Sequence, residues 1–411
     1  MQNLVLFYLF IILLACSGQS SEQTNDQNLD SITMIEKARQ LAHKFIITDG
    51  HIDIPYRLNE VMEDVSVRTE LGEFDFVRAK EGGLDAPFMS IYVPSSYQET
   101  GGAREFAEKM IDLVEEIQAQ HPEKFAIARS PEEVEKLVAK GLIALPMGME
   151  NGAPIENDLS NIQYFYHRGI RYITLTHAKD NLICDSSYDT TRTWNGLSPF
   201  GSKVVREMNR VGIMVDISHI SDSAFYQVMK VSQAPAIASH SSCRHFTPGW
   251  ERNMTDDMIK VLALKGGVIQ IAFGSTFLDE ASNTSNKEIQ KHLKQWQKTR
   301  DELSSKEEIK AYKHQYHREH YIYSTTSRVV DHIDRVVSLA GIDHVAFGSD
   351  FDGAGDSLPV GLKDVSQYPN IIEELLRRGY SEEDIAQICY KNVFRVWNQT
   401  AEIAVSLQQS G

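Results

Sequence analysis

The chain has 411 residues, of which 42% are hydrophobic, and it carries a formal net charge of −16. This length and composition are typical of a soluble globular protein with a large core, built as one big α/β domain or two smaller ones. The negative charge argues against binding to nucleic acid or adhesion to anionic lipid headgroups, because either would need a positively charged surface.

The N-terminus has the features of an export signal. Residues 1–15 are apolar but too short to span a membrane comfortably, which favours a signal peptide. They run into Leu13-Leu14-Ala15-Cys16, which resembles the lipobox at which bacterial lipoproteins are cleaved and lipidated. We therefore predict an exported protein, in the bacterial periplasm or at the outer membrane, anchored through lipidated Cys16, with residues 16–31 as a flexible tether. The start of the signal has no Lys or Arg, so an uncleaved anchor helix is the alternative.

Three further cysteines, Cys184, Cys243 and Cys389, are widely spaced and odd in number. This pattern predicts neither a disulfide framework nor a cysteine zinc site, so we expect buried thiols.

From residue 45 onward, strand-like apolar runs alternate with helix-like segments, which is typical of a parallel α/β sheet or barrel. The predicted strands are Phe45–Asp49, Ala86–Val93, Leu142–Met149, Tyr172–Thr176, Ile213–Ile217, Ala234–Ser239, Val268–Phe273 and Val345–Gly348. Eight βα units predict a TIM-like (β/α)8 barrel, so residues 32–411 are expected to form a single catalytic domain.

Two stretches lie outside the eight units. Residues 276–324 contain neither Gly nor Pro and are rich in Lys, Glu, Gln and His, so we predict a helical insertion after the seventh strand. Its four histidines are expected on a solvated helical face rather than at a metal. The tail from Ser381 to Trp397 opens with a good N-terminal cap and carries apolar residues that should pack against the barrel.

In a barrel of this kind the active-site residues lie at the carboxyl ends of the strands. Six of the eight predicted strands end in a residue that can bind a metal ion or transfer a proton. In chain order these residues are His51 and Asp53, Glu150, His177, His219, His240 and Asp350. Any one of them alone could be a structural polar group at the rim, but together they predict one site.

Imidazole and carboxylate ligands without a thiolate suit a borderline divalent ion, and zinc is the predicted metal. The ligands suffice for two zinc ions if one carboxylate bridges them. Glu150 is the predicted bridge, because its strand lies between the two sets of histidines. Two ions about 3.5 to 4 Å apart would hold a bridging hydroxide and polarise a carbonyl oxygen, which predicts hydrolysis of an amide.

The remaining groups then acquire roles. If His177 is not a ligand, it can stabilise the oxyanion of a tetrahedral intermediate, and Asp350 can pass the proton of the water to the leaving amine. The loop after His240 offers Arg244 and Arg252 for a bidentate pair with a substrate carboxylate, and their spacing does not decide between them.

Six motifs occur in the order of a known family. They are Asp49-Gly50-His51-Ile52-Asp53, Thr174-Leu175-Thr176-His177, Asp216-Ile217-Ser218-His219, Ser239-His240-Ser241-Ser242, Arg252-Asn253 and Gly348-Ser349-Asp350-Phe351-Asp352-Gly353. With them the chain, from about Thr48 to Trp397, resembles the membrane (renal) dipeptidase family, which are zinc peptidases on a TIM-like barrel of the metal-dependent amidohydrolase type.

The resemblance implies a role for each of these residues. The metal ligands it implies are His51 and Asp53 on the first zinc ion, Glu150 on both, and His219 and His240 on the second. His177 and Arg252 become substrate contacts, so the resemblance selects Arg252 over Arg244, and Asp350 becomes the acid–base residue. The implied activity is the hydrolysis of dipeptides, often with a D-residue at the C-terminal position, and of some β-lactams; a homodimer is implied as well.

The chain also departs from the family pattern. Met149-Glu150-Asn151-Gly152 stands where Glu-Gly-Gly is usual, residues 178–187 lack the usual Cys-Asn pair, and the insertion is longer than in the animal members and could cover the mouth. These departures predict a different substrate range rather than a different chemistry.

Two alternatives use the same fold. One is a related hydrolase acting on a lactone, a cyclic amide or a phosphoester, although the fourth strand ends in Thr176-His177 rather than in the lysine that bridges the metals in many such enzymes. The other is a lipid-anchored binding protein without catalysis, which would require a defect in the ligand set that the sequence does not show.

Overall fold

The computed structural model describes residues 33–299 and 305–410. The predicted signal peptide (1–15), the lipidated Cys16 and the tether (16–31) lie outside these residues. Eight parallel strands form one sheet that curls into a nearly closed barrel, which confirms the predicted (β/α)8 fold. In spatial order they are β1 (Ile47–Ile52), β2 (Leu84–Tyr92), β5 (Met147–Glu150), β6 (Ile170–Thr174), β7 (Met214–Asp216), β8 (Ile237–Ser241), β9 (Val268–Ile271) and β10 (Val345–Phe347).

The seam of the barrel lies between its first and last strands. The Asp350 N–H donates to the His51 carbonyl (3.0 Å), and the Asp53 N–H donates to the Phe351 carbonyl (2.9 Å). Hydrogen bonding at the seam carries β1 beyond its predicted end at Asp49. His51 therefore lies inside β1 and not after it.

The predicted third strand, Leu142–Met149, is two strands in the structure. Pro146 separates β4 (Ile143–Leu145) from β5, because proline has no N–H to give to a sheet. β4 pairs with β3 (Phe125–Ile127) in a small separate sheet, and only β5 joins the barrel. The apolar run alone could not reveal this change of partner.

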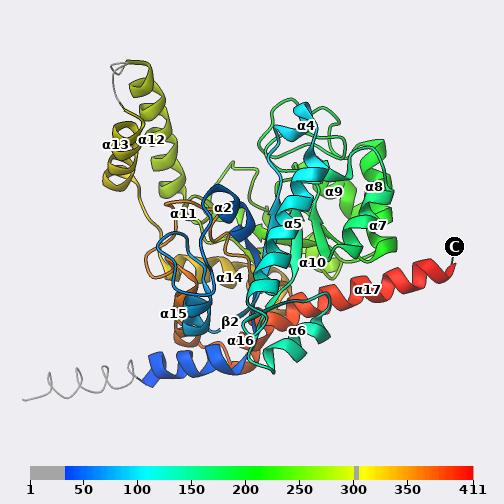
Figure 1. The fold of residues 1–411 in the computed structure, drawn as a ribbon, viewed down its shortest axis with the longest axis horizontal. Coiled ribbons are helices and arrows are strands. Elements are labelled where there is room, and N and C mark those ends of the chain that lie inside the picture. The colour runs from blue at the N-terminus through cyan, green and yellow to red at the C-terminus, as the bar shows by residue number, and fades with distance from the viewer. Residues whose placement is uncertain (1–32, 300–304, 411) are drawn as a thin grey trace, which may run out of the picture.

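Helices cover the outside of the barrel (Figure 1). Those that follow the strands are α2 (Ile54–Glu60), α3 (Phe76–Gly82), α4 (Tyr97–Thr100), α5 (Ala103–Gln120), α6 (Pro131–Val138), α7 (Ser160–His167), α8 (Pro199–Val211), α9 (Asp222–Val231), α10 (Asp256–Leu264), α14 (Thr326–Ala340) and α15 (Tyr368–Arg377). The side chains of Ser198, Ser221 and Thr255 accept a first-turn N–H and so fix where three of them begin. The cysteines Cys184, Cys243 and Cys389 are free and buried, as predicted.

The C-terminal segment closes the base of the barrel. Ser381 and Asp384 form a reciprocal capping box at the start of α16 (Glu382–Ala386), which confirms the predicted cap. A π-helical turn (Gln387–Lys391) leads into α17 (Asn392–Ser410). Trp397 is buried against Phe88 of β2, with ring centroids 5.3 Å apart, so this tail packs against the barrel as expected.

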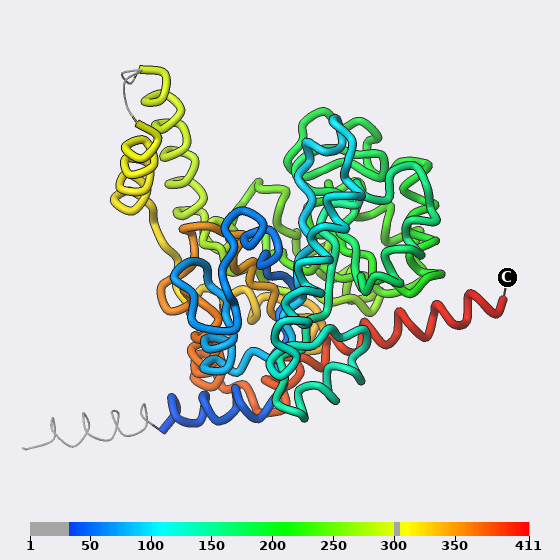
Figure 2. The backbone as a smooth tube through the Cα atoms, viewed as in Figure 1, coloured from blue at the N-terminus to red at the C-terminus, as the bar shows by residue number. Residues whose placement is uncertain are grey.

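The segment 276–324 falls on α11 (Ser275–Leu278), α12 (Glu280–Thr299) and α13 (Lys306–His320). α12 and α13 form a hairpin that projects from the body of the molecule (Figure 2). His292 stacks on Tyr316 at 3.9 Å, and the Tyr323 hydroxyl donates to Asp356 in the loop after β10 (2.8 Å). Among the described residues, none of the helices combines the length and the apolar character that crossing a membrane requires.

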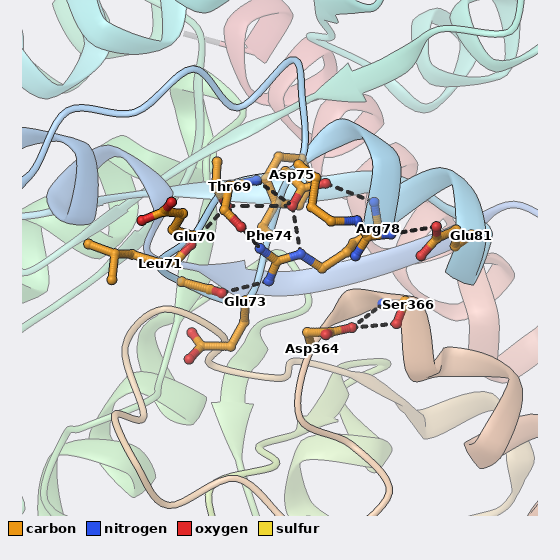
Figure 3. A network of polar contacts seen from close by, with 12 residues as sticks. Thr69, Glu70, Leu71, Glu73, Phe74, Asp75, Arg78, Glu81, Asp364 and Ser366 are labelled. Atoms are coloured by element: carbon orange, nitrogen blue, oxygen red, sulfur yellow. Dashed lines mark hydrogen bonds and ion pairs between the residues drawn. The ribbon is translucent and has the colours of Figure 1, made fainter. Parts of the chain in front are cut away.

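A partly buried pair of acidic residues fastens the loop after α2 to the loop after β10. Arg78 orders the first loop by donating to Asp75 and to the carbonyls of Thr69 and Gly72 (Figure 3). The Glu73 N–H donates to the Asp352 carboxylate and the Asp352 N–H donates to the Glu73 carboxyl group, both at 2.6 Å. Burial and the neighbouring Asp352 raise the pKa of Glu73 to about 9, so Glu73 is protonated at neutral pH. We call this pair the loop clamp.

Candidate active site

The carboxyl ends of the strands bring the predicted site residues together. His51 and Asp53 come from β1 and its end, Glu150 from β5, and His240 from β8. The third residue after β6, β7 and β10 is His177, His219 and Asp350, respectively. The guanidinium of Arg252, in the loop between β8 and α10, lies 3.1 Å from His219 Nε2. Arg244, the other candidate, pairs instead with Asp222 at 2.5 and 2.7 Å.

Glu150 lies at the centre, and its two oxygens face different histidines. Oε2 lies 3.5 Å from His51 Nε2. Oε1 lies 3.0 Å from His219 Nε2, 3.3 Å from His240 Nε2 and 3.8 Å from His177 Nε2. On the far side of His51, Asp53 Oδ2 is 3.5 Å from the same Nε2 atom. One carboxylate therefore faces two groups of donors through separate oxygens.

Tyr172 orients the His51 ring. Its hydroxyl donates to the Gly50 carbonyl (3.0 Å) and lies 2.8 Å from His51 Nδ1. Because the one hydroxyl proton is already used, Nδ1 must carry the proton and donate, which leaves Nε2 with a free lone pair. Tyr172 reaches His51 across the barrel only because residue 148 is glycine, since a Cβ there would lie 1.9 Å from the tyrosine ring.

Ser239 gives His240 the same tautomer. Its hydroxyl donates to Asp216 Oδ2 (2.6 Å) and so must accept from His240 Nδ1–H (2.8 Å). Asp216 also accepts the N–H groups of Ser218 and Ser239, at 3.0 and 2.8 Å, so its position is fixed from several sides. His51 and His240 thus both present Nε2 toward Glu150.

The electrostatics of the site favour a cation. Burial raises the pKa of Glu150, but His177 and His51 lower it well below its usual value, so this carboxylate is charged. Burial lowers the pKa of His51, yet Tyr172, Asp53 and Glu150 raise it well above the usual range. The carboxylates therefore stabilise positive charge at His51 Nε2, in the form of a proton or of a metal ion.

The other histidines are neutral. Burial, with smaller effects from His51 and Arg252, lowers the pKa of His240 to about 3. Burial and the Arg252 guanidinium lower the pKa of His219 well below normal, and burial lowers that of His177. Burial and the charge of Asp53 raise the pKa of Asp350 well above normal, so this carboxylate has a higher proton affinity than an ordinary aspartate and suits a group that takes up and returns a proton.

The backbone around the site is strained. Asn151, His219 and Asp350 are not glycine, yet their φ angles are 80°, 68° and 63°. Each lies within three residues of the end of a barrel strand, where the chain turns sharply at the rim of the site. Left-handed conformations of this kind cost energy and cluster at functional sites.

The donor set fits metal ions. Three groups bring their ligand atoms within 4.8 Å of one another: His51, Glu150 and His240; Glu150, His177 and His219; and His51, Asp53 and Asp350. His51 Nε2 and Asp53 Oδ1 are buried without a hydrogen-bond partner, which is costly unless another group satisfies them. Imidazoles with free Nε2 atoms and clustered carboxylates are the ligands that zinc and similar ions prefer.

Several residues of the site did not emerge from the sequence. Tyr172, Ser239 and Asp216 hold the imidazoles but bind no metal themselves. Alternation along β6 would have placed Tyr172 on the same inward face as Thr174, and Ser239 directly precedes a predicted ligand. These two features of the sequence could have pointed to Tyr172 and Ser239. Which histidine each residue supports depends on contacts across the barrel, which the sequence does not show.

The sequence of this chain matches a known protein family. The sequence model of the membrane dipeptidase family (peptidase family M19) matches residues 35–411. The chain belongs to the membrane dipeptidase family. It is therefore a hydrolase, and the resemblance carried by the six motifs is confirmed.

The relatives match over most of their length. Dipeptidase ataJ of Aspergillus terreus is 30% identical, over 93% of this chain and 92% of that protein. The crystal structure of the probable dipeptidase PvdM from Pseudomonas aeruginosa has a TM-score of 0.78 and 27% identity, covering 90% of this chain and 99% of that one. A metallopeptidase from Rhodobacter sphaeroides, liganded with a phosphinate mimic of the dipeptide L-Ala-D-Ala, has a TM-score of 0.71 and 25% identity, covering 87% and 99%.

Proposed function

We propose that this member of the family hydrolyses dipeptides with two zinc ions, and that it accepts a D-residue at the C-terminal position. The observation that carries the proposal is the position of Glu150, whose two oxygens face separate groups of donors. The L-Ala-D-Ala mimic bound by the Rhodobacter sphaeroides relative supports the dipeptide substrate and the D-residue.

The residues divide between the two ions through Glu150. His51 and Asp53 would hold the first ion together with Oε2, and His219 and His240 would hold the second together with Oε1. When bound, two such ions supply a nucleophile derived from water at neutral pH and polarise the carbonyl oxygen of the scissile amide.

The protein groups around this centre position the dipeptide and move protons. Arg252 pairs with the free C-terminal carboxylate of the substrate, because its buried Nε has no hydrogen-bond partner in the structure. His177 remains beside Glu150 as an oxyanion donor. Asp350 accepts the proton of the attacking water and delivers it to the leaving amine.

One substrate panel tests this function. The purified protein is assayed with Gly-D-Ala, an L,L-dipeptide, a tripeptide and a lactone, and metal is measured on the same sample. We expect cleavage of the dipeptides only, with about two zinc ions per chain as a dinuclear site requires. Turnover of the lactone without cleavage of dipeptides would overturn the proposal. If Arg252→Ala had the same KM for Gly-D-Ala as the wild type, Arg252 would not bind the substrate carboxylate.

The cellular location is a further proposal. We infer that the chain is exported and anchored by a lipid on Cys16, because Leu13-Leu14-Ala15-Cys16 follows a short apolar stretch. The test is fractionation of cells fed a labelled fatty acid. Label should appear on the wild-type protein and be absent from Cys16→Ala, which should move to the soluble fraction. Light scattering on the released protein tests the homodimer expected from the family resemblance.

A further inference from the structure

Tyr188 takes no part in the proposed mechanism, yet it lies in the wall of the site. Its side chain is 43% exposed. Burial raises the pKa of Tyr188, Arg252 lowers it, and Asp350 and Glu150 raise it further, so the phenol lies near these residues of the site. Tyr188 therefore presents a partly exposed ring beside His219.

Two more aromatic residues continue this wall around Arg252. The Tyr188 ring centroid is 5.7 Å from the His219 ring and 6.4 Å from the Trp250 ring. Trp250 lies 5.2 Å from Phe277, and the Arg252 guanidinium carbon lies 5.2 Å over the Phe277 ring. We call Tyr188, Trp250 and Phe277 the aromatic rim.

The loop that carries Tyr188 is held in place. The Ser187 N–H donates to the His219 carbonyl (2.7 Å), and the Tyr188 N–H donates to the Ser186 hydroxyl (3.1 Å). The next residue, Asp189, accepts from the N–H and hydroxyl of Thr191, at 3.0 and 2.8 Å. A ring presented to solvent on a loop fastened to the end of a barrel strand can bind a ligand without first being ordered.

From this placement we propose that Tyr188 and Trp250 form the subsite for the side chain of the substrate's C-terminal residue, and that this subsite favours aromatic and branched apolar side chains. The inference rests on the proposed function, in which Arg252 binds the carboxylate of that residue. The side chain branches from the carbon next to this carboxylate, so it starts only a few bonds from Arg252 and reaches the rim. Aromatic faces and edges pack well with apolar and aromatic groups.

The test compares substrates that differ only at the C-terminal residue. Wild-type protein is assayed with Gly-D-Phe and Gly-D-Ala, and kcat and KM are measured separately. We expect kcat/KM to be at least about ten-fold higher for Gly-D-Phe, mostly through KM, because the rim contacts the side chain in ground state and transition state alike.

Three variants locate the effect. In Tyr188→Ala the ratio of kcat/KM for Gly-D-Phe to that for Gly-D-Ala should fall to within about two-fold of one. Continued hydrolysis of Gly-D-Ala would show that this variant is folded. Tyr188→Phe should keep the preference, because the ring and not the hydroxyl forms the wall. Trp194→Ala removes an exposed aromatic residue of the same loop, whose indole donates to the Asn181 carbonyl, and should leave the preference unchanged.

The outcomes separate the inference from the function on which it rests. If the wild type hydrolyses neither dipeptide, the proposed function is wrong and the subsite falls with it. If it hydrolyses both without preference, or if Tyr188→Ala keeps the preference, the function stands and the subsite is wrong.

Discussion

At the scale of single residues, one carboxylate determines what this site can do. Glu150 is buried among four imidazoles, and its two oxygens face different histidines. Glu150→Gln keeps the shape but removes the negative charge, so we expect metal content to fall to one ion per chain or fewer. Activity should fall at least about 100-fold. The matched control is Glu156→Gln, an exposed glutamate in the loop just beyond; normal zinc content in Glu150→Gln would contradict the bridging role.

The hydroxyl behind His240 offers a finer test at this scale. Ser239→Ala leaves Nδ1 of His240 without its acceptor, so the ring loses its fixed tautomer and orientation. We expect the affinity for metal to fall by about 10- to 100-fold, measured by competition with a chelator. Ser90→Ala is the control, because the Ser90 hydroxyl is equally buried but has no hydrogen-bond partner. Equal affinities in the two variants would show that Ser239 does not position the ligand.

At the scale of elements, the loop clamp makes stability depend on pH. The raised pKa of Glu73 means that the folded chain keeps a proton which the unfolded chain releases near pH 4.5. The contribution of Glu73 is therefore complete below about pH 4.5 and is lost as the pH rises toward about 9. Glu73→Gln cannot titrate, so the wild type should lose stability relative to this variant between pH 6 and 9, by on the order of 1 kcal/mol per pH unit.

The test of the loop clamp is to measure the midpoint of thermal unfolding of each protein across this pH range. The exposed Glu70→Gln, from the same loop, is the control and should follow the wild type at every pH. A constant difference between wild type and Glu73→Gln would mean that Glu73 is already ionised in the folded protein.

Helices and strands were predictable from the sequence where a periodic pattern of apolar residues determines them. They were less predictable where pairing with another strand determines their bounds. Alternation of apolar runs and helical segments predicted all eight barrel positions and placed the candidate site residues at the strand ends, where the structure brings them together. The same pattern could not show that Pro146 redirects β4 to another sheet, nor that seam bonding extends β1 past His51. α17 runs to Ser410, well past Trp397, and Ala404 in this extension is buried.

The choice between Arg244 and Arg252 shows the same limit within the site. Both residues lie in the loop after His240, and only the resemblance to the family selected between them. The structure adds the physical reason, since Asp222 of α9 holds Arg244 while Ser241 and the His240 carbonyl aim Arg252 at His219. A tertiary contact of this kind leaves no local trace in the sequence.

At the scale of the whole molecule, metal should stabilise the fold. Glu150, Asp53 and Asp350 are buried close together, so a bound cation would offset the repulsion between these carboxyl groups. Removal of metal with a chelator should lower the thermal midpoint by about 5 °C or more, and added zinc should restore it. An unchanged midpoint in protein that elemental analysis shows to be metal-free would contradict this expectation.

The seam of the barrel has a consequence for how the protein is made. His51 and Asp350 meet across the first and last strands of the barrel, so residues far apart along the chain must come together before the site exists. During synthesis, the ribosome releases His51 long before it has made β10. An incomplete chain can therefore hold most of the histidines and still hydrolyse nothing, and catalytic competence marks the end of folding rather than a stage within it.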